Sequence, residues 1–353
     1  MVFLFLQVRY NKEMSFAQKI RRIDYIGNIL LIAATVAVLY ALTYGGTRYL
    51  WSSWRIVVPL VLGLVGLCVF MGFETTPYVR EPVIPPRLFG NRTSATVFAV
   101  TFLNSALLYW VMFFLPVYFQ AVLLSSPARS GVQLLPIIVV AVPAAIVAVL
   151  LLAKFGKYKP LHLFGFGVCT IGLGLFTLFD RHTSMAEWVI FQMITGGGSG
   201  FVLNTLLPAC QAGLMESDQA AATAAWSFVR SFGNIWGVAI PAAIFNNRFS
   251  QLSHRIQDPK IRAALSHGKS YESASASFIT SFPGSLRDEV ISVYVDSLKR
   301  VWEISIVFSA VSFLLVFVEK QIKLRTELET EYGLDEKKDG QDVEAGDKEK
   351  TSN

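Results

Sequence analysis

Long apolar runs alternate with polar connections along most of this chain. Several runs extend for 18 residues or more without a charged side chain, which is the length a helix needs to cross a bilayer. We therefore expect an all-α integral membrane protein. We predict eight membrane-spanning helices, at residues 25–44, 56–73, 93–123, 131–153, 161–179, 186–208, 220–246 and 301–318.

The polar connections indicate how the chain is divided. Residues 74–92 contain four prolines, so residues 23–92 are interpreted as two spans and a proline-rich loop, and residues 93–318 as a six-helix bundle. A polar segment near 247–298 predicts a long loop outside the cell. Residues 1–22 are interpreted as the stub of a preceding helix and a basic linker, which makes the chain an N-terminally truncated one. Residues 319–353, with eleven acids and seven bases, predict a disordered tail.

Composition and charge support this interpretation. The chain is 53% hydrophobic and 16% charged, with a mean hydropathy of +0.49 and a net charge of +6. With the N-terminus in the cytoplasm, fourteen Lys and Arg residues flank the spans inside and four outside. The basic excess thus follows membrane topology, not nucleic-acid binding, and predicts two cytoplasmic termini. We expect the plasma membrane, with the vacuolar membrane as the alternative.

The sequence offers little for enzymatic chemistry. The four histidines and three cysteines have no spacing suited to a metal site or to a nucleophile with its base. We therefore expect no catalytic residue, no metal and no cofactor. A structural or receptor role without transport stays open.

Arg230 is the charged residue expected deepest in the membrane. A helix that begins near residue 220 places it about 15 Å along the axis, close to the middle of the hydrocarbon core. A guanidinium at that depth faces protein or a water-filled cavity. Two interpretations stay open: Arg230 lines a transport pathway, or it binds a polar network that locks helices together.

The predicted span over residues 93–123 carries an aromatic and polar stripe. At 100° per residue, six side chains fall within about 60° of one face: Phe102, Ser105, Tyr109, Phe113, Pro116 and Gln120. Such a face could line a cavity for an amphipathic, partly aromatic small molecule, although packing is the commoner use. Gln192 and Asn204 are similar candidates in the glycine-rich span.

Three further features restrict the mechanism. The acids near the spans, Glu319 among them, all lie at span ends, so no carboxylate that could titrate is expected at depth. The run GGGSG at 196–200 lacks a phosphate-loop ending and predicts close helix packing. The basic turn at 154–160 is interpreted as a topology determinant, with a gating role also possible.

Four stretches of this sequence resemble one transporter family. They are RRIDYIG at 21–27, FGKYKP at 155–160, GGGSG at 196–200, and AAWSFVRSFG at 224–233 followed by WG at 236–237 and IFNN at 244–247. Together they resemble the C-terminal portion of the fourteen-span drug:proton antiporter branch of the fungal major facilitator superfamily.

The resemblance implies efflux of drugs, toxins or secondary metabolites, with a siderophore or nutrient carrier of the same fold as the alternative. It implies that the first two spans are linker helices and that the next six form the C-terminal bundle. The first and fourth helices of a bundle line the cavity in this family, which favours Tyr109, Gln120, Gln192 and Asn204. Proton coupling is implied too, with its site expected in an N-terminal half absent here. The family's acidic residue before the basic turn has no counterpart at 152–154.

Overall fold

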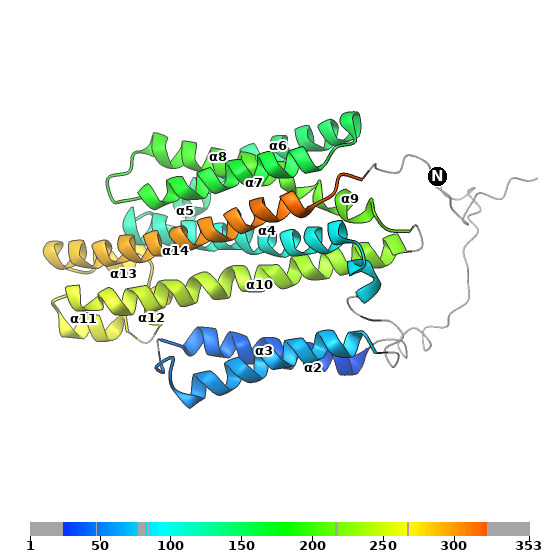
Figure 1. The fold of residues 1–353 in the computed structure, drawn as a ribbon. Coiled ribbons are helices and arrows are strands. Elements are labelled where there is room, and N and C mark those ends of the chain that lie inside the picture. The colour runs from blue at the N-terminus through cyan, green and yellow to red at the C-terminus, as the bar shows by residue number, and fades with distance from the viewer. Residues whose placement is uncertain are drawn as a thin grey trace, which may run out of the picture. The chain divides into compact units, whose positions relative to one another are not determined.

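The computed structural model describes residues 24–322, apart from residues 47, 77–81, 83–84, 216–217 and 267. Every regular element in this part of the chain is helical, as the sequence predicts (Figure 1). The α-helices are α2 (Tyr25–Tyr44), α3 (Trp54–Glu74), α4 (Arg92–Val117), α5 (Pro127–Gln133), α6 (Leu135–Phe155), α7 (Lys159–Leu175), α8 (Met185–Leu203), α9 (Leu206–Gln211), α10 (Gln219–Leu252), α11 (Pro259–Ala264), α12 (Lys269–Glu272), α13 (Ala276–Thr280) and α14 (Gly284–Val318). The predicted stub at 1–22 and the tail beyond residue 322 lie outside the described residues.

The eight predicted spans are confirmed in number and place. Eight helical segments in the described residues are long and apolar enough to cross a membrane, and each contains most of one predicted span. Hydropathy succeeds here because each helix must present apolar side chains to lipid along its length.

The predicted loop near 247–298 is largely helical, which corrects the sequence interpretation. This segment contains the end of α10, the short helices α11, α12 and α13, and the first half of α14. Residues before 301 escape a hydropathy criterion because the helix is polar on one side there. The other side of this part of α14 carries Val290, Tyr294 and Leu298, which are four residues apart and therefore share one helical face. All three are buried in the largest cluster of hydrophobic side chains.

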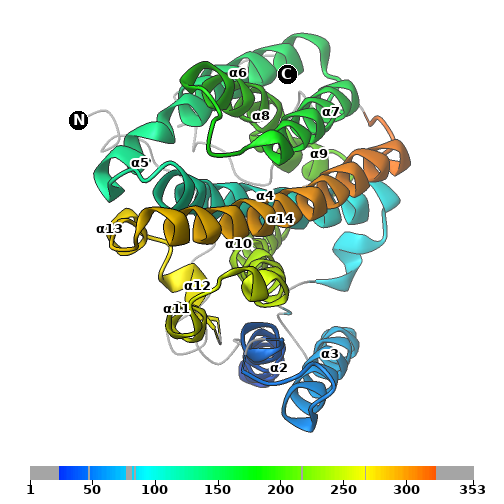
Figure 2. The ribbon, with the colours of Figure 1, turned by 90° about the vertical axis from the view of Figure 1, so that its left-hand side faces the viewer.

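The helices pack around α4, which is the most buried of the spans. In Figure 2, α6, α7 and α8 lie together on one side of α4 and α14. On the other side α10 packs against both α4 and α14, and the pair α2 and α3 follows beyond α10. The segments α3 and α6 bury the smallest share of their apolar windows, as expected of helices that face lipid.

The glycine cluster of α8 allows two neighbouring helices to approach closely. A Cβ on Gly196 would lie 2.3 Å from the carbonyl oxygen of Ile137 in α6, and one on Gly200 would lie 2.4 Å from that of Ala141. A Cβ on Gly198 would lie 2.4 Å from the backbone nitrogen of Cys169 in α7. The prediction of close packing is thereby confirmed, because only hydrogen fits at these three positions.

Candidate functional site

The aromatic and polar stripe of α4 reaches an open pocket at one end of the helix. Tyr109 is half-buried and its ring stacks on that of Phe113, with centroids 5.9 Å apart. Phe113 is 42% exposed. An aromatic side chain left this open in a core helix presents a flat apolar surface to whatever fills the space beside it.

The pocket has a volume of about 400 Å³ and contains the end of the stripe. Gln120, Pro116 and Phe113 form one wall, and Tyr271 and Glu272 of α12 contribute on the other side. The pocket therefore combines aromatic surface with an amide and a carboxylate, which suits an amphipathic organic molecule. Of the predicted residues, Gln120 lines it directly, while Tyr109 supports Phe113 one turn away.

Gln192 and Asn204 occupy very different surroundings on α8. Gln192 is fully buried, and its amide nitrogen donates to the carbonyl oxygens of Gln133 at 3.0 Å and Trp188 at 3.2 Å. Asn204 is exposed at the C-terminal end of the helix. The structure therefore does not bring these two side chains together, and Gln192 fastens α8 to the end of α5.

Arg230 projects from α10 and is partly exposed. Its guanidinium carbon lies 5.3 Å from the ring centroid of Trp226, one turn earlier in the same helix. It makes no hydrogen bond or ion pair within the described residues. A cation over an indole ring gains about 0.5–1 kcal/mol at an exposed site, far less than a carboxylate partner would give a buried charge. Within the described part of the chain, Arg230 is therefore held by stacking on Trp226.

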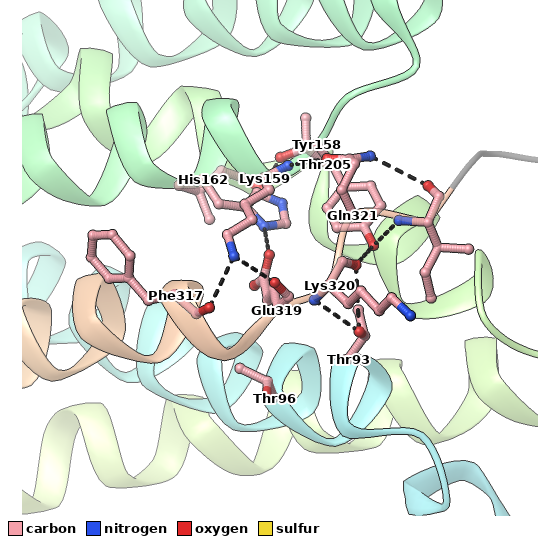
Figure 3. Close-up of polar contacts among 12 residues, drawn as sticks. Thr93, Thr96, Tyr158, Lys159, His162, Thr205, Phe317, Glu319, Lys320 and Gln321 are labelled. Carbon is pink, nitrogen blue, oxygen red and sulfur yellow. Dashed lines mark hydrogen bonds and ion pairs between the residues drawn. The ribbon is translucent and has the colours of Figure 1, made fainter.

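A second polar cluster joins the start of α7 to the end of α14 (Figure 3). Nδ1 of His162 lies 2.9 Å from Oε2 of Glu319, and neither side chain has exposed surface. The other two polar atoms of the pair, Nε2 and Oε1, are also buried and have no hydrogen-bond partner in the described residues. The contact between the imidazole and the carboxylate therefore joins α7 to the residue after α14 through two fully buried side chains.

Lys159 supports this pair from the first turn of α7. Its Nζ donates to the carbonyl oxygens of Phe317 at 2.9 Å and Glu319 at 2.6 Å. These carbonyl oxygens lie at the C-terminal end of α14, where no following helical turn supplies amide donors. The two helix ends also complement each other electrostatically. The Glu319 carboxylate lies at the positive N-terminus of α7, and the Lys159 ammonium lies at the negative C-terminus of α14.

The residues after α14 continue along the same cluster, and we call residues 319–322 the strap. The Tyr158 hydroxyl donates to the carbonyl oxygen of Lys320 and accepts from the amide of Ile322 at 3.0 Å. The Thr93 hydroxyl at the start of α4 accepts from the amide of Lys320 at 3.0 Å. Burial raises the pKa of the Tyr158 hydroxyl, so it remains a donor. The strap thereby connects the ends of α4, α7 and α14.

Sequence reasoning located the parts of this cluster but did not combine them. Glu319 lies at a span end, as expected, and its partner His162 lies in the first turn of α7. Both are fully buried. The basic turn before α7 does more than mark topology, since its Tyr158 and Lys159 bind the strap. A histidine in the first turn of one span and a glutamate directly after another was the available signal.

Comparison with known proteins gives consistent matches. A family model described as a fungal trichothecene efflux pump matches residues 4–126. The MFS-type transporter TwmF of Talaromyces wortmannii is 51% identical over 345 residues, which is 97% of this chain and 63% of that protein. The MFS-type efflux pump LUC4 of a Fusarium species is 47% identical over 336 residues, or 95% of this chain and 60% of that protein.

The fold has a likeness among solved structures as well. A bacterial homologue of the human lysosomal transporter Spinster, in an inward-facing and occupied conformation, superposes with a TM-score of 0.51. The match covers 84% of this chain and 68% of that one at 14% identity, so it concerns the fold alone.

Proposed function

Because the chain belongs to the fungal MFS-type efflux transporters, we propose that it acts in the export of amphipathic small molecules such as drugs, toxins or secondary metabolites. The chain spans about 60% of the length of the curated relatives it matches. A C-terminal portion of a longer transporter fits these matches. Export is therefore a proposal about the whole transporter to which these helices contribute.

The pocket at the end of α4 is the observation that carries this proposal. It combines the open ring of Phe113 with the polar groups of Gln120 and Glu272, the mixture that an amphipathic cargo requires. Within the proposed division, α2 and α3 are the linker pair and α4 to α14 form the C-terminal bundle. Alternating access then comes from this bundle rocking against a second one around a shared cavity.

The coupling and the location of the protein are parts of the same proposal. Proton coupling fits the family, with its coupling site in the part of the relatives that this chain does not span. The distribution of basic residues supports two cytoplasmic termini. We propose the plasma membrane as the location, with the vacuolar membrane as the alternative. A transporter needs no catalytic residue, in keeping with a protein that is not an enzyme. Neither TwmF nor LUC4 is named as a siderophore or nutrient carrier, so that alternative is not favoured.

Export by cells that express the full-length gene product tests the proposal. A labelled amphipathic compound is loaded into a drug-sensitive yeast, and its retention is measured with and without a pH gradient. We expect faster loss from expressing cells and a dependence on the gradient. Retention equal to that of empty-vector cells, at proven surface expression, would contradict export.

Arg230→Ala in the same system separates the two roles of that arginine. Normal surface expression with lost export assigns Arg230 to the pathway. Lost expression assigns it to the scaffold. Trp226→Phe serves as the matched variant, because it keeps an aromatic ring under the guanidinium.

A further inference from the structure

A charged pocket lies between α10 and α14, far from the strap. Its volume is about 570 Å³, and its walls include Arg248 and Gln251 of α10 and Asp296, Lys299 and Arg300 of α14. Lys299 precedes Glu319 by twenty positions, which corresponds to about 30 Å along a helix. The pocket is therefore at the opposite end of the bundle from the His162–Glu319 pair.

The ion pairs in this pocket leave two positive charges uncompensated. Asp296 binds the guanidinium of Arg255, and Glu303 binds that of Arg300 at 3.0 Å. Neither Arg248 nor Lys299 has a carboxylate partner among the described residues. The two acids of the pocket are thus already engaged, and the free charge is positive.

Arg248, a residue of the pocket wall, also has an unused donor. Its Nη1 donates to Oε1 of Gln251 at 3.2 Å, but its Nε is buried and has no hydrogen-bond partner within the described part of the chain. A buried donor that lacks an acceptor destabilises the protein, and more so in a charged group. An anionic group in the pocket would balance the positive charges of Arg248 and Lys299.

An apolar track leads away from the pocket along α14. Ile304 belongs to the pocket wall, and Val307, Val311 and Leu314 follow it at helical spacings of three and four residues. These three side chains are 57%, 41% and 62% exposed. Their face is continuous with the charged wall, so a ligand that follows both surfaces has an anionic head and an apolar chain.

We propose that the pocket between α10 and α14 binds the phosphate of an anionic phospholipid, whose acyl chain lies along Ile304, Val307, Val311 and Leu314. Arg248 and Lys299 bind the phosphate oxygens, and the engaged acids Asp296 and Glu303 exclude a second anion. The apolar track lies within the span predicted at residues 301–318, and Asp296, Lys299 and Arg300 lie just before that span begins. This is the order of acyl chain and headgroup in a lipid leaflet. A soluble phosphate shares the head chemistry but not the apolar contact.

Lipid titration of the purified chain tests this site. The chain is prepared in a neutral maltoside detergent, and bound phosphatidylglycerol is counted by native mass spectrometry as the lipid is added. We expect Lys299→Ala, and more strongly Arg248→Ala with Lys299→Ala, to weaken binding by at least about tenfold, since each removes a charge-assisted contact. Lys260→Ala is the matched control, because it removes one exposed base from α11 outside the pocket.

Two further measurements identify the ligand. Val311→Asn disrupts the track alone, and we expect it to weaken phosphatidylglycerol binding several-fold. Inorganic phosphate is titrated in parallel and should give no comparable protection against thermal unfolding. Equal lipid binding by the double variant and the Lys260→Ala control would overturn the proposal. Protection by inorganic phosphate that matches the lipid and survives Val311→Asn would overturn it as well, because the ligand would then be a soluble anion.

Discussion

The side chains of His162 and Glu319 meet at 2.9 Å although 157 positions separate them in the chain. The contact ties the first turn of α7 to the residue directly after α14, with both side chains fully buried. Because neither side chain has exposed surface, we expect the stability of the pair to depend on each side chain having the other.

Removal of the carboxylate from this pair should destabilise the bundle. We expect Glu319→Ala to lower the free energy of unfolding by about 3–5 kcal/mol, since it leaves a buried imidazole without its partner. Glu319→Gln should cost less, because its amide oxygen can still accept from His162. Denaturant unfolding of the purified chain in detergent measures both. Lys320→Ala is the control, since its backbone contacts persist, and equal losses for Glu319→Ala and this control would contradict the prediction.

The ammonium of Lys159 should hold the end of α14 in helical form. We expect Lys159→Met to weaken this end by about 0.5–1.5 kcal/mol through the loss of two hydrogen bonds to carbonyl oxygens. Hydrogen exchange of the amides at 316–322 should then accelerate. Lys157→Met, two residues earlier and exposed, should leave exchange unchanged. The prediction fails if both variants exchange alike.

Adjacent glycines of α8 should respond differently to a methyl group. Gly196→Ala places a Cβ 2.3 Å from a carbonyl oxygen of α6, and we expect a loss of about 1–3 kcal/mol in stability. Gly197→Ala meets only Val140, at 3.6 Å, and should be neutral or slightly stabilising. Thermal unfolding and surface expression compare the two. Similar behaviour of the variants would show that α8 and α6 do not pack this closely.

The pocket of α4 should determine cargo binding without contributing much to stability. We expect Phe113→Ala and Gln120→Ala to reduce binding of an amphipathic cargo by about tenfold or more, because aromatic surface and an amide contact are lost. Quenching of a fluorescent cargo by the full-length transporter reports the affinity. Val58→Ala of α3, similarly exposed but distant from the pocket, should bind normally. Unchanged affinity in both pocket variants would place the cargo elsewhere.

The membrane-spanning helices and the packing of 196–200 could be predicted because each follows from a local pattern. A run of apolar residues is enough to predict a membrane-spanning helix. A cluster of small residues within such a helix predicts close packing against a neighbouring helix. The pair of His162 and Glu319 could not be predicted, since hydropathy places both residues at a water-exposed edge. Only the packing of α7 against α14 decides that this edge is buried.

The beginning of α14 was missed for a related reason. A hydropathy criterion detects the part of a helix that meets lipid, whereas residues 284–300 bury one face against protein and leave the other polar. The pocket between α10 and α14 depends on this extension, because Asp296, Lys299 and Arg300 lie just before the predicted start at residue 301.

The strap has a consequence for how the protein is made. The groups that satisfy His162, Tyr158 and Lys159 belong to residues 317–322, which leave the ribosome after all eight spans have been synthesised. Until then the N-terminal end of α7 carries an imidazole and an ammonium that lack these partners. A nascent chain interrupted before residue 319 therefore keeps polar side chains at the start of α7 that have no hydrogen-bond partners. Cellular quality control can distinguish such a chain from the finished protein by these unpaired groups.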